Sequence, residues 1–299
     1  MRLNRYLNSL LAILALGTCL ATPVLAQDAY PSKPLKVIVP FPAGGATDIL
    51  TRAITEKLAV KLGQSVVIEN RPGAGGSIGI NAVINSPPDG YTLLLGYAGT
   101  LSINPLLSDK VPFDSVKDFA PIGKIGDAIL ILVANNDFQG KTLSDVITIS
   151  KKDSNGLSYG TSGAGGTPHI AGELFKQKTG ANLVHVPYKG SPPALQDIMA
   201  GQVAFMFDGM TTSIPNIKGG KLRSILVTSP QRSRMLPDVP TAAEIGRKDL
   251  EASVWFGLWM AEGVPRAAFD RLRSETLRVL QLPSVREKLI QAGLELSQP

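Results

Sequence analysis

The chain changes its pattern abruptly within the stretch LKVIVPFPAGGATDIL, residues 35–50. The apolar, β-branched run 35–39 predicts a buried strand, and the loop 40–48 that follows it is rich in proline and glycine. From Asp48 onwards, apolar residues recur at helical spacing until Gly63 ends the pattern. A strand, a glycine-rich loop and a helix in this order indicate a βα unit on a parallel sheet.

The same alternation continues along the chain. We expect further strands at residues 66–68, 91–95, 129–133, 157–159, 183–186, 203–207, 222–227 and 254–260. We expect helices at 78–84, 266–280 and 284–292, and others that begin near Leu143, Thr167, Pro192 and Thr211. The fold class predicted from this order is α/β.

Two successive series of such units predict two lobes. We place the crossings between them near residues 125–128 and 253–256, so that the second lobe comprises 126–254. The first lobe then combines 27–125 with the C-terminal segment 255–299. Each lobe is expected to be a mostly parallel sheet flanked by helices, with a ligand cleft between the lobes.

The first 26 residues have the pattern of a signal peptide. Arg2 and Arg5 precede an apolar run, and Val24-Leu25-Ala26 supplies the small residues of a cleavage site, which we place after Ala26. The run is short for a spanning helix, so a retained anchor is the less favoured alternative. A lipoprotein cut before Cys19 is a minor alternative, because Thr18 suits the preceding position poorly. We therefore expect an exported protein in the periplasm.

The composition excludes several classes of function. Loss of the leader with Arg2 and Arg5 reduces the formal charge from +6 to +4, and the basic residues are scattered, so we expect no nucleic-acid partner. The mature chain has no cysteine, and the protein has two histidines, which leaves little for a metal site. We expect no metal and no cofactor.

Four loops at the ends of predicted strands carry the side chains and glycines that suit a ligand. In parallel sheets such loops meet at one edge, and a helix that begins there presents free backbone amides to an anion. Residues 40–48 can equally be a plain capped turn. The four loops are 40–48, 96–100 with Asn104 and Pro105, 160–169, and 187–190 with 207–209.

Motifs for catalysis and nucleotide binding are incomplete. The end of a P-loop is present at 140–142, but position 135 is asparagine, and the glycines at 73, 75 and 79 are spaced too widely for a dinucleotide fingerprint. Residues 160–164 come close to a nucleophile elbow but end in alanine. A serine hydrolase that uses Ser162 and His169 therefore remains as an alternative, and we favour a protein that is not an enzyme.

Several long motifs, in order, cover the whole mature chain. They are YPSKP (30–34), VIVPFPAGG (37–45) with Thr47 and Asp48, ENRPGAGG (69–76), PDGYTL (88–93), YGTSG (159–163), TPH (167–169), VPYKG (186–190) and PDVPT (237–241) with Glu244. In these motifs the chain resembles the Bug (TctC-like) receptors of tripartite tricarboxylate transporters.

The resemblance implies a type II-like periplasmic binding protein fold whose lobes close on a ligand carboxylate. The residues implied to bind the ligand are Phe41, Ala43, Gly44, Gly45, Thr47, Asp48, Thr100, Ser162, Gly163, Gly166, Thr167, His169, Tyr188 and Asp208. Tyr97 and Ala98 stand where members of the family vary, and such positions read the distal end of the ligand.

The function implied is capture of a small carboxylate, such as a di- or tricarboxylate or an acidic amino acid, for transient delivery to membrane transporter subunits. The chain is expected to act as a monomer. A ligand sensor that docks on a membrane signalling protein uses the same cleft and stays open as an alternative, because both roles need the same closure.

Overall fold

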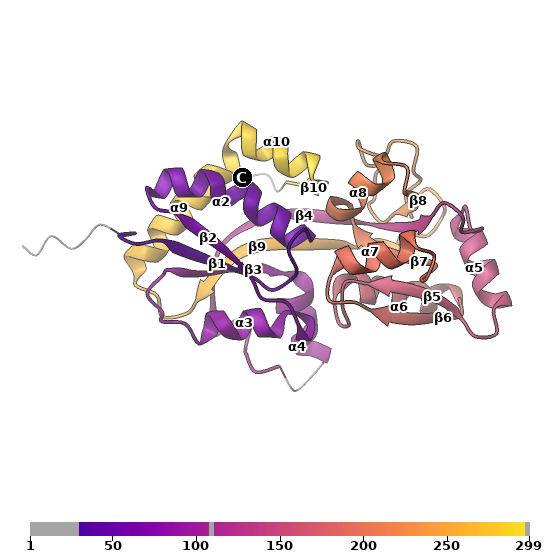
Figure 1. The fold of residues 1–299 in the computed structure, drawn as a ribbon, viewed down its shortest axis with the longest axis horizontal. Coiled ribbons are helices and arrows are strands. Elements are labelled where there is room, and N and C mark those ends of the chain that lie inside the picture. Colours follow the sequence, from indigo (N-terminus) through magenta and orange to yellow (C-terminus); the bar gives the residue numbers. More distant parts are fainter. Residues whose placement is uncertain (1–29, 108–110, 297–299) are drawn as a thin grey trace, which may run out of the picture.

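One long strand, β4 (Phe119–Asn135), runs through both lobes of the molecule (Figure 1). The computed structural model describes residues 30–107 and 111–296, so the predicted leader and Cys19 lie outside the described residues. β4 pairs with β9 (Ser253–Ala261) up to Ile129, and from Leu130 onwards it pairs with β7 (Phe205–Gly209). The change of partners within one strand joins the two sheets directly.

The sheet of the first lobe contains the strand–loop–helix unit with which the described part of the chain begins. β1 (Leu35–Val39) lies parallel to both of its neighbours, β2 (Val66–Asn70) and β3 (Thr92–Tyr97). β9 joins antiparallel between β3 and β4, and the short β10 (Leu294–Glu295) pairs with the other edge of β4. The parallel core of this sheet agrees with the βα pattern of the sequence.

Helices cover both faces of the first sheet. α2 (Ala46–Leu62), α9 (Arg266–Gln281) and α10 (Pro283–Gln291) pack together on one face (Figure 1). The other face carries α3 (Ser77–Ile84), and near it lie η1 (Ala74–Gly76), the π-helical turn η2 (Gly99–Ile103) and α4 (Asn104–Leu107). The C-terminal helices therefore return to the first lobe, where Lys288 forms an ion pair with Glu56.

The second lobe repeats the arrangement. Its sheet has the order β4-β7-β5-β6, with β5 (Leu157–Thr161) parallel to β6 (Leu183–Pro187) and to β7, and β8 (Leu222–Val227) pairs with β4. The helical segments of this lobe are α5 (Leu143–Lys152), α6 (Thr167–Thr179), α7 (Ser191–Met199), α8 (Met210–Lys218) and η3 (Lys248–Leu250). The predicted fold class is confirmed, and the limits of the two lobes in residue numbers stay a prediction.

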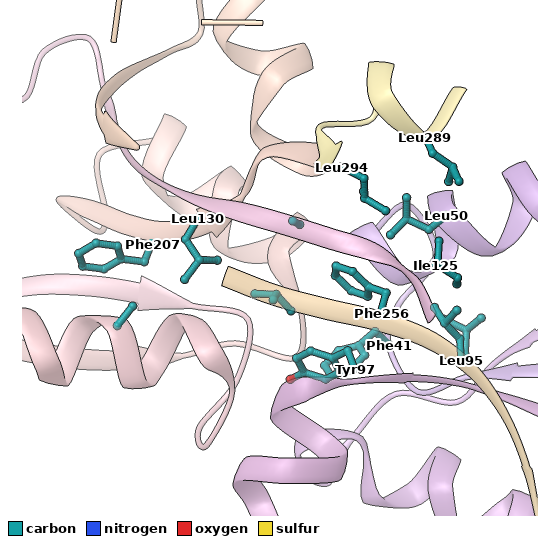
Figure 2. Close-up of a cluster of buried hydrophobic side chains, with 14 of the residues drawn as sticks. Phe41, Leu50, Leu95, Tyr97, Ile125, Leu130, Phe207, Phe256, Leu289 and Leu294 are labelled. Atoms are coloured by element: carbon teal, nitrogen blue, oxygen red, sulfur yellow. The ribbon is translucent and has the colours of Figure 1, made fainter. Parts of the chain in front are cut away.

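The apolar core extends to the junction of the lobes. Figure 2 shows Phe41, Tyr97 and Phe256 close together where β4 and β9 pass towards the second lobe. The Phe41 and Tyr97 rings meet edge to face with their centroids 5.1 Å apart, and Phe256 stacks on Tyr97 at 6.2 Å. These rings supply an apolar floor between the lobes.

Among the described residues, no helix is both long and apolar enough to span a bilayer.

Candidate ligand-binding cleft

Four helices begin at the junction of the lobes, and each has a glycine at its N-cap. The N-caps are Gly45 of α2, Gly166 of α6, Gly190 of α7 and Gly209 of α8, and none of these helices has a side-chain cap. The first backbone amides of an uncapped helix lack partners, and the helix dipole makes this end positive. The junction therefore offers amides from both lobes to an anion.

A small inner pocket lies between these helix starts. Its volume is about 50 Å³, room for roughly four water-sized groups, which suits a carboxylate and an attached carbon. Most of its walls are apolar, and Phe41, Tyr97 and Phe256 form part of them. The lining residues are Phe41, Pro42, Gly45, Ala46, Thr47, Tyr97, Ala128, Leu130, Ser162, Pro168, Gly190, Ser191, Asp208, Gly209, Val254 and Phe256.

Three threonine hydroxyls near the pocket have no hydrogen-bond partner within the protein. Thr47, Thr167 and Thr211 stand in the first turns of α2, α6 and α8 and are 5%, 7% and 4% exposed. A buried hydroxyl without a partner costs free energy, so such groups are normally satisfied by water or ligand. Thr47 lines the pocket itself, while Thr167 precedes the lining residue Pro168. Thr47 Oγ1 is therefore an unpartnered polar atom in the wall of a mostly apolar pocket, where a ligand could satisfy it.

Asp208 is the acidic residue of the inner pocket, and it is fully buried at the end of β7. Ser191 donates to its Oδ1 at 2.5 Å, and Thr212 and Ser213 donate to its Oδ2 at 2.6 and 2.7 Å. Burial raises the pKa of Asp208, although these hydrogen bonds oppose the shift. Asp208 therefore ties the first turns of α7 and α8 together.

A larger outer groove continues from the inner pocket. Its volume is about 720 Å³, and Phe41 and Ser162 line both cavities. On one side lies the glycine-rich segment 73–76, and on the other lie residues 162–165 and 187–189 of the second lobe. Lys189 is the one cationic side chain among the described residues that line either cavity. The cleft thus has a narrow, apolar interior and a wider, more polar mouth.

The two lobes touch across the cleft at glycines. A Cβ added to Gly190 would meet Pro42 Cδ at 2.8 Å, and one added to Gly166 would meet the Tyr97 hydroxyl at 3.1 Å. Both pairs join the second lobe to the first. The absence of a side chain at Gly190 therefore permits the close approach of the lobes.

The structure brings together part of the set of residues that the sequence indicated. Phe41, Gly45, Thr47 and Asp208 line the inner pocket with Ser162, and the outer groove adds two more, Gly163 and Tyr188. The remaining residues of the set line neither cavity: Ala43, Gly44, Asp48, Thr100, Gly166, Thr167 and His169.

Asp48 holds the first-lobe loop, residues 40–48, in place through hydrogen bonds. Its carboxylate accepts from Arg52, from the Gly44 amide and from Asn70, and it is 3% exposed. Burial alone would raise its pKa, but these donors hold the pKa below its usual value. These protein donors show that Asp48 fixes the geometry of the loop, and its contact with a ligand stays a prediction.

Thr100 also supports a loop. It is fully buried, donates to the Tyr97 carbonyl at 3.1 Å, and its methyl group would clash with a Cβ on Gly76. Thr100 therefore packs against Gly76 of the segment 73–76, and its contact with a ligand stays a prediction.

His169 and His185 support the second-lobe loop, residues 160–169, through hydrogen bonds and ring stacking. The Gly165 amide donates to His169 Nδ1 at 3.1 Å, the two imidazole rings stack at 4.0 Å, and His185 Nε2 lies 2.6 Å from the Thr161 hydroxyl. Because Ser162 lines the pocket and His169 does not, the geometry gives no support to a serine nucleophile activated by this base.

This histidine pair predicts a pH dependence of stability. Burial, helped by the neighbouring His169, lowers the pKa of His185 to about 4 from about 6.5 in the unfolded chain. Neutral, buried His185 therefore makes its full contribution to the free energy of unfolding above pH 6.5. This free energy declines as the pH falls towards 4, and the loss is about 1–2 kcal/mol near pH 5. Urea unfolding at pH 7 and pH 5 should show this loss. The variant His185→Gln should lose less, and an equal loss in both proteins would contradict the assignment.

Some pocket residues lie outside the four loops that the sequence indicated. Ser191 lines the inner pocket, as do Ala128, Leu130, Val254 and Phe256 of the two strands that join the lobes. Ser191 directly follows Gly190 at the start of a predicted helix, so the position of that helix start was the available signal. The strands that cross between the lobes carry no local polar signal. Within the described residues, no group of three His, Cys, Asp or Glu side chains could hold a metal ion.

Comparison with known proteins gives a consistent relationship. The sequence profile of the family described as tripartite tricarboxylate transporter family receptor, TctC, matches residues 50–299. Protein BugT of Bordetella pertussis is 36% identical over 275 residues, which are 92% of this chain and 84% of BugT.

Solved structures are similar along most of the chain. The periplasmic binding protein BugD is 36% identical with a TM-score of 0.85, over 89% of both chains. MatC from Rhodopseudomonas palustris with bound malate is 31% identical with a TM-score of 0.86, over 90% of this chain and 92% of MatC. An R. palustris protein with adipate is 33% identical with a TM-score of 0.87, over 90% of both chains. The chain therefore belongs to the TctC family of tripartite tricarboxylate transporter receptors, which are periplasmic solute-binding proteins and not enzymes.

Proposed function

We propose that this receptor captures a small carboxylate in the inner pocket and presents it to the membrane subunits of its transporter. The observation that carries the proposal is the convergence of four uncapped helix N-termini on a pocket that holds the unpartnered Thr47 hydroxyl. A carboxylate there would accept from amides of both lobes, so that binding favours closure. Relatives solved with malate and adipate support the same class of ligand.

The division of the cleft suggests how the rest of the ligand is held. The inner pocket has space for a carboxylate and little more, so a longer chain would pass between Phe41 and Ser162 into the outer groove. There Lys189 offers a positive charge to a second carboxylate. A di- or tricarboxylate fits this arrangement, and we propose that the receptor acts as a monomer.

Isothermal titration of the chain beginning at Gln27 tests the proposal. The panel contains mono-, di- and tricarboxylates together with their neutral amides. We expect at least one carboxylate to bind and to raise the melting temperature, and its amide to show no binding. Failure of every carboxylate, with unchanged melting temperatures, would refute the proposed function.

Lys189 provides a test of the distal end. The variant Lys189→Met should weaken dicarboxylate binding by about fivefold or less, because the side chain is exposed and its charge is screened. Monocarboxylates should bind unchanged. Lys218→Met, which removes an exposed lysine outside both cavities, is the matched control in the same titrations. Equal weakening by both variants would contradict a specific contact at Lys189.

A further inference from the structure

The glycine-rich loop of the second lobe depends on neighbouring side chains for its shape. Residues 162–166 have the sequence SGAGG; the first four line the mouth of the cleft, and Gly166 is the N-cap of α6. Gly163 and Gly165 have positive φ values of 148° and 75°. Because glycines lose much conformational entropy when they are ordered, such a loop keeps one shape only where its backbone groups are held.

Each of the two histidines supports one half of this loop. Nδ1 of His169 accepts from the Gly165 amide at 3.1 Å. Nε2 of His185 lies 2.6 Å from the Thr161 hydroxyl, which donates to the Gly163 carbonyl at 3.2 Å. The two imidazole rings stack with their centroids 4.0 Å apart. Both glycines with positive φ are therefore tied to the histidine pair.

The two histidines respond differently to a proton. Nδ1 of His169 accepts from the Gly165 amide only while it carries no proton, because a protonated Nδ1 would set two donors against each other. The Thr161 hydroxyl has one proton, which it gives to Gly163, so Nε2 of His185 is the donor to Thr161. A second proton on His185 would bind at Nδ1 and leave this hydrogen bond in place. His169 is therefore the proton-sensitive support of the loop.

The surroundings of His169 favour its neutral form at neutral pH. Burial lowers the pKa of His169 below its usual value, although Glu173, one turn further along α6, opposes the shift. His185 faces it from β6, and burial lowers the pKa of His185 to about 4, so that this ring is uncharged as well. Tyr159 of β5 donates to Glu173 at 2.7 Å, and Lys176 Nζ lies 3.8 Å from the same carboxylate. Glu173 thus contacts two other side chains, and no described carboxylate is hydrogen-bonded to His169.

We infer that His169 is a positioning residue whose neutral imidazole holds the second-lobe loop in the shape that binds the ligand, so that acidification weakens binding. This inference rests on the proposed function and adds regulation by pH to the same cleft. If the bound form requires neutral His169, a proton lowers the affinity for the ligand by the factor by which the ligand lowers the affinity for the proton. Attraction between a protonated imidazole and a carboxylate would act in the opposite direction, but His169 lines neither cavity. The geometry of the loop therefore decides the sign.

Nuclear magnetic resonance of the ligand-free protein tests the link between imidazole and loop. Between pH 7 and pH 5, the Gly165 amide signal should shift with the same midpoint as the His169 ring. In His169→Asn the side-chain oxygen replaces Nδ1 as an acceptor that does not titrate, so the amide should lose this response. A Gly165 amide that stays unmoved while the wild-type His169 ring titrates would overturn the inference, whatever the ligand is.

Calorimetry with malate and adipate, the ligands of two solved relatives, tests the effect on binding. From pH 7 to pH 5, the dissociation constant should rise about fivefold more in the wild-type protein than in His169→Asn. Protonation of the acid itself cancels from this comparison. An equal rise in both proteins, or a tighter wild-type complex at pH 5, would overturn the inference and leave the proposed function intact. Failure of both acids at pH 7 would count against the proposed function, and the amide signal would then decide the role of His169.

Two further variants separate positioning from packing. His169→Ala has no acceptor for the Gly165 amide, and at pH 7 it should bind the same acid about fivefold more weakly than His169→Asn does. His185→Gln keeps a donor towards Thr161 and removes the other titrating ring, so it should retain the wild-type pH dependence of affinity. A pH dependence that disappears in His185→Gln and persists in His169→Asn would assign the effect to His185 and overturn the inference.

Discussion

Replacing Asp208 with alanine should lower the free energy of unfolding by about 3 kcal/mol and the melting temperature by about 5–10 °C. The change leaves the Ser191, Thr212 and Ser213 hydroxyls without their common acceptor in a fully buried position. It also releases the first turns of α7 and α8 from each other. Ligand affinity should fall with stability, because both helix starts line the inner pocket.

A second aspartate in the same lobe gives the control. Asp197 accepts one hydrogen bond, from the Tyr188 hydroxyl at 2.5 Å, and it is partly exposed. Asp197→Ala should therefore cost less than about 1 kcal/mol. Urea unfolding of both variants measures the difference. Equal losses of stability would show that the buried network around Asp208 has no special role.

Replacing Gly190 with alanine should lower ligand affinity by about 30-fold, the second large effect that we expect. The new Cβ would meet Pro42 Cδ at 2.8 Å and Cγ at 3.1 Å, so the lobes could not approach as closely as they do in this structure. The proline ring is stiff and cannot turn away. Closure of the lobes then becomes less favourable, and the affinity for a ligand that binds the closed form falls accordingly.

Backbone strain must be separated from the clash between the lobes. Gly190 has φ = 149°, which is unfavourable for alanine, and Gly163 has nearly the same φ of 148° with no atom closer than 3.5 Å to an added Cβ. Gly163→Ala should therefore lose about as much stability as Gly190→Ala, but less of the affinity for the ligand. Adding Pro42→Ala to Gly190→Ala should restore much of the affinity in calorimetry. A double variant as weak as Gly190→Ala would contradict the clash.

The sequence predicted the fold well where local patterns act alone. The strand, loop and helix at residues 35–62 follow from apolar periodicity and glycine, and β1 and α2 lie where those patterns indicate. The length of β4 was missed, because Phe119–Ile129 is interrupted by proline, glycine and charged residues. This half of the strand is held by pairing with β9, which lies more than a hundred residues away. Such tertiary pairing leaves no local signal.

The candidate site was predictable in outline and not in detail. Glycine-rich loops after strands pointed to the right edge of both sheets, and Thr47 and Ser162 do line the inner pocket. The direction of each side chain within a loop could not be predicted. Asp48 and His169 belong to loops that reach the cleft, but their side chains accept hydrogen bonds from amides of their own loops. The apolar wall at Val254 was also missed, since its strand comes from a distant part of the chain.

A crystal structure of the protein with a carboxylate bound is the most direct test of the central claim. We predict that the carboxylate lies in the inner pocket and accepts from backbone amides at the starts of α2 and of at least one second-lobe helix, with Thr47 Oγ1 as a further donor. A carboxylate bound only in the outer groove beside Lys189, with the inner pocket filled by the apolar part of the ligand, would contradict the claim.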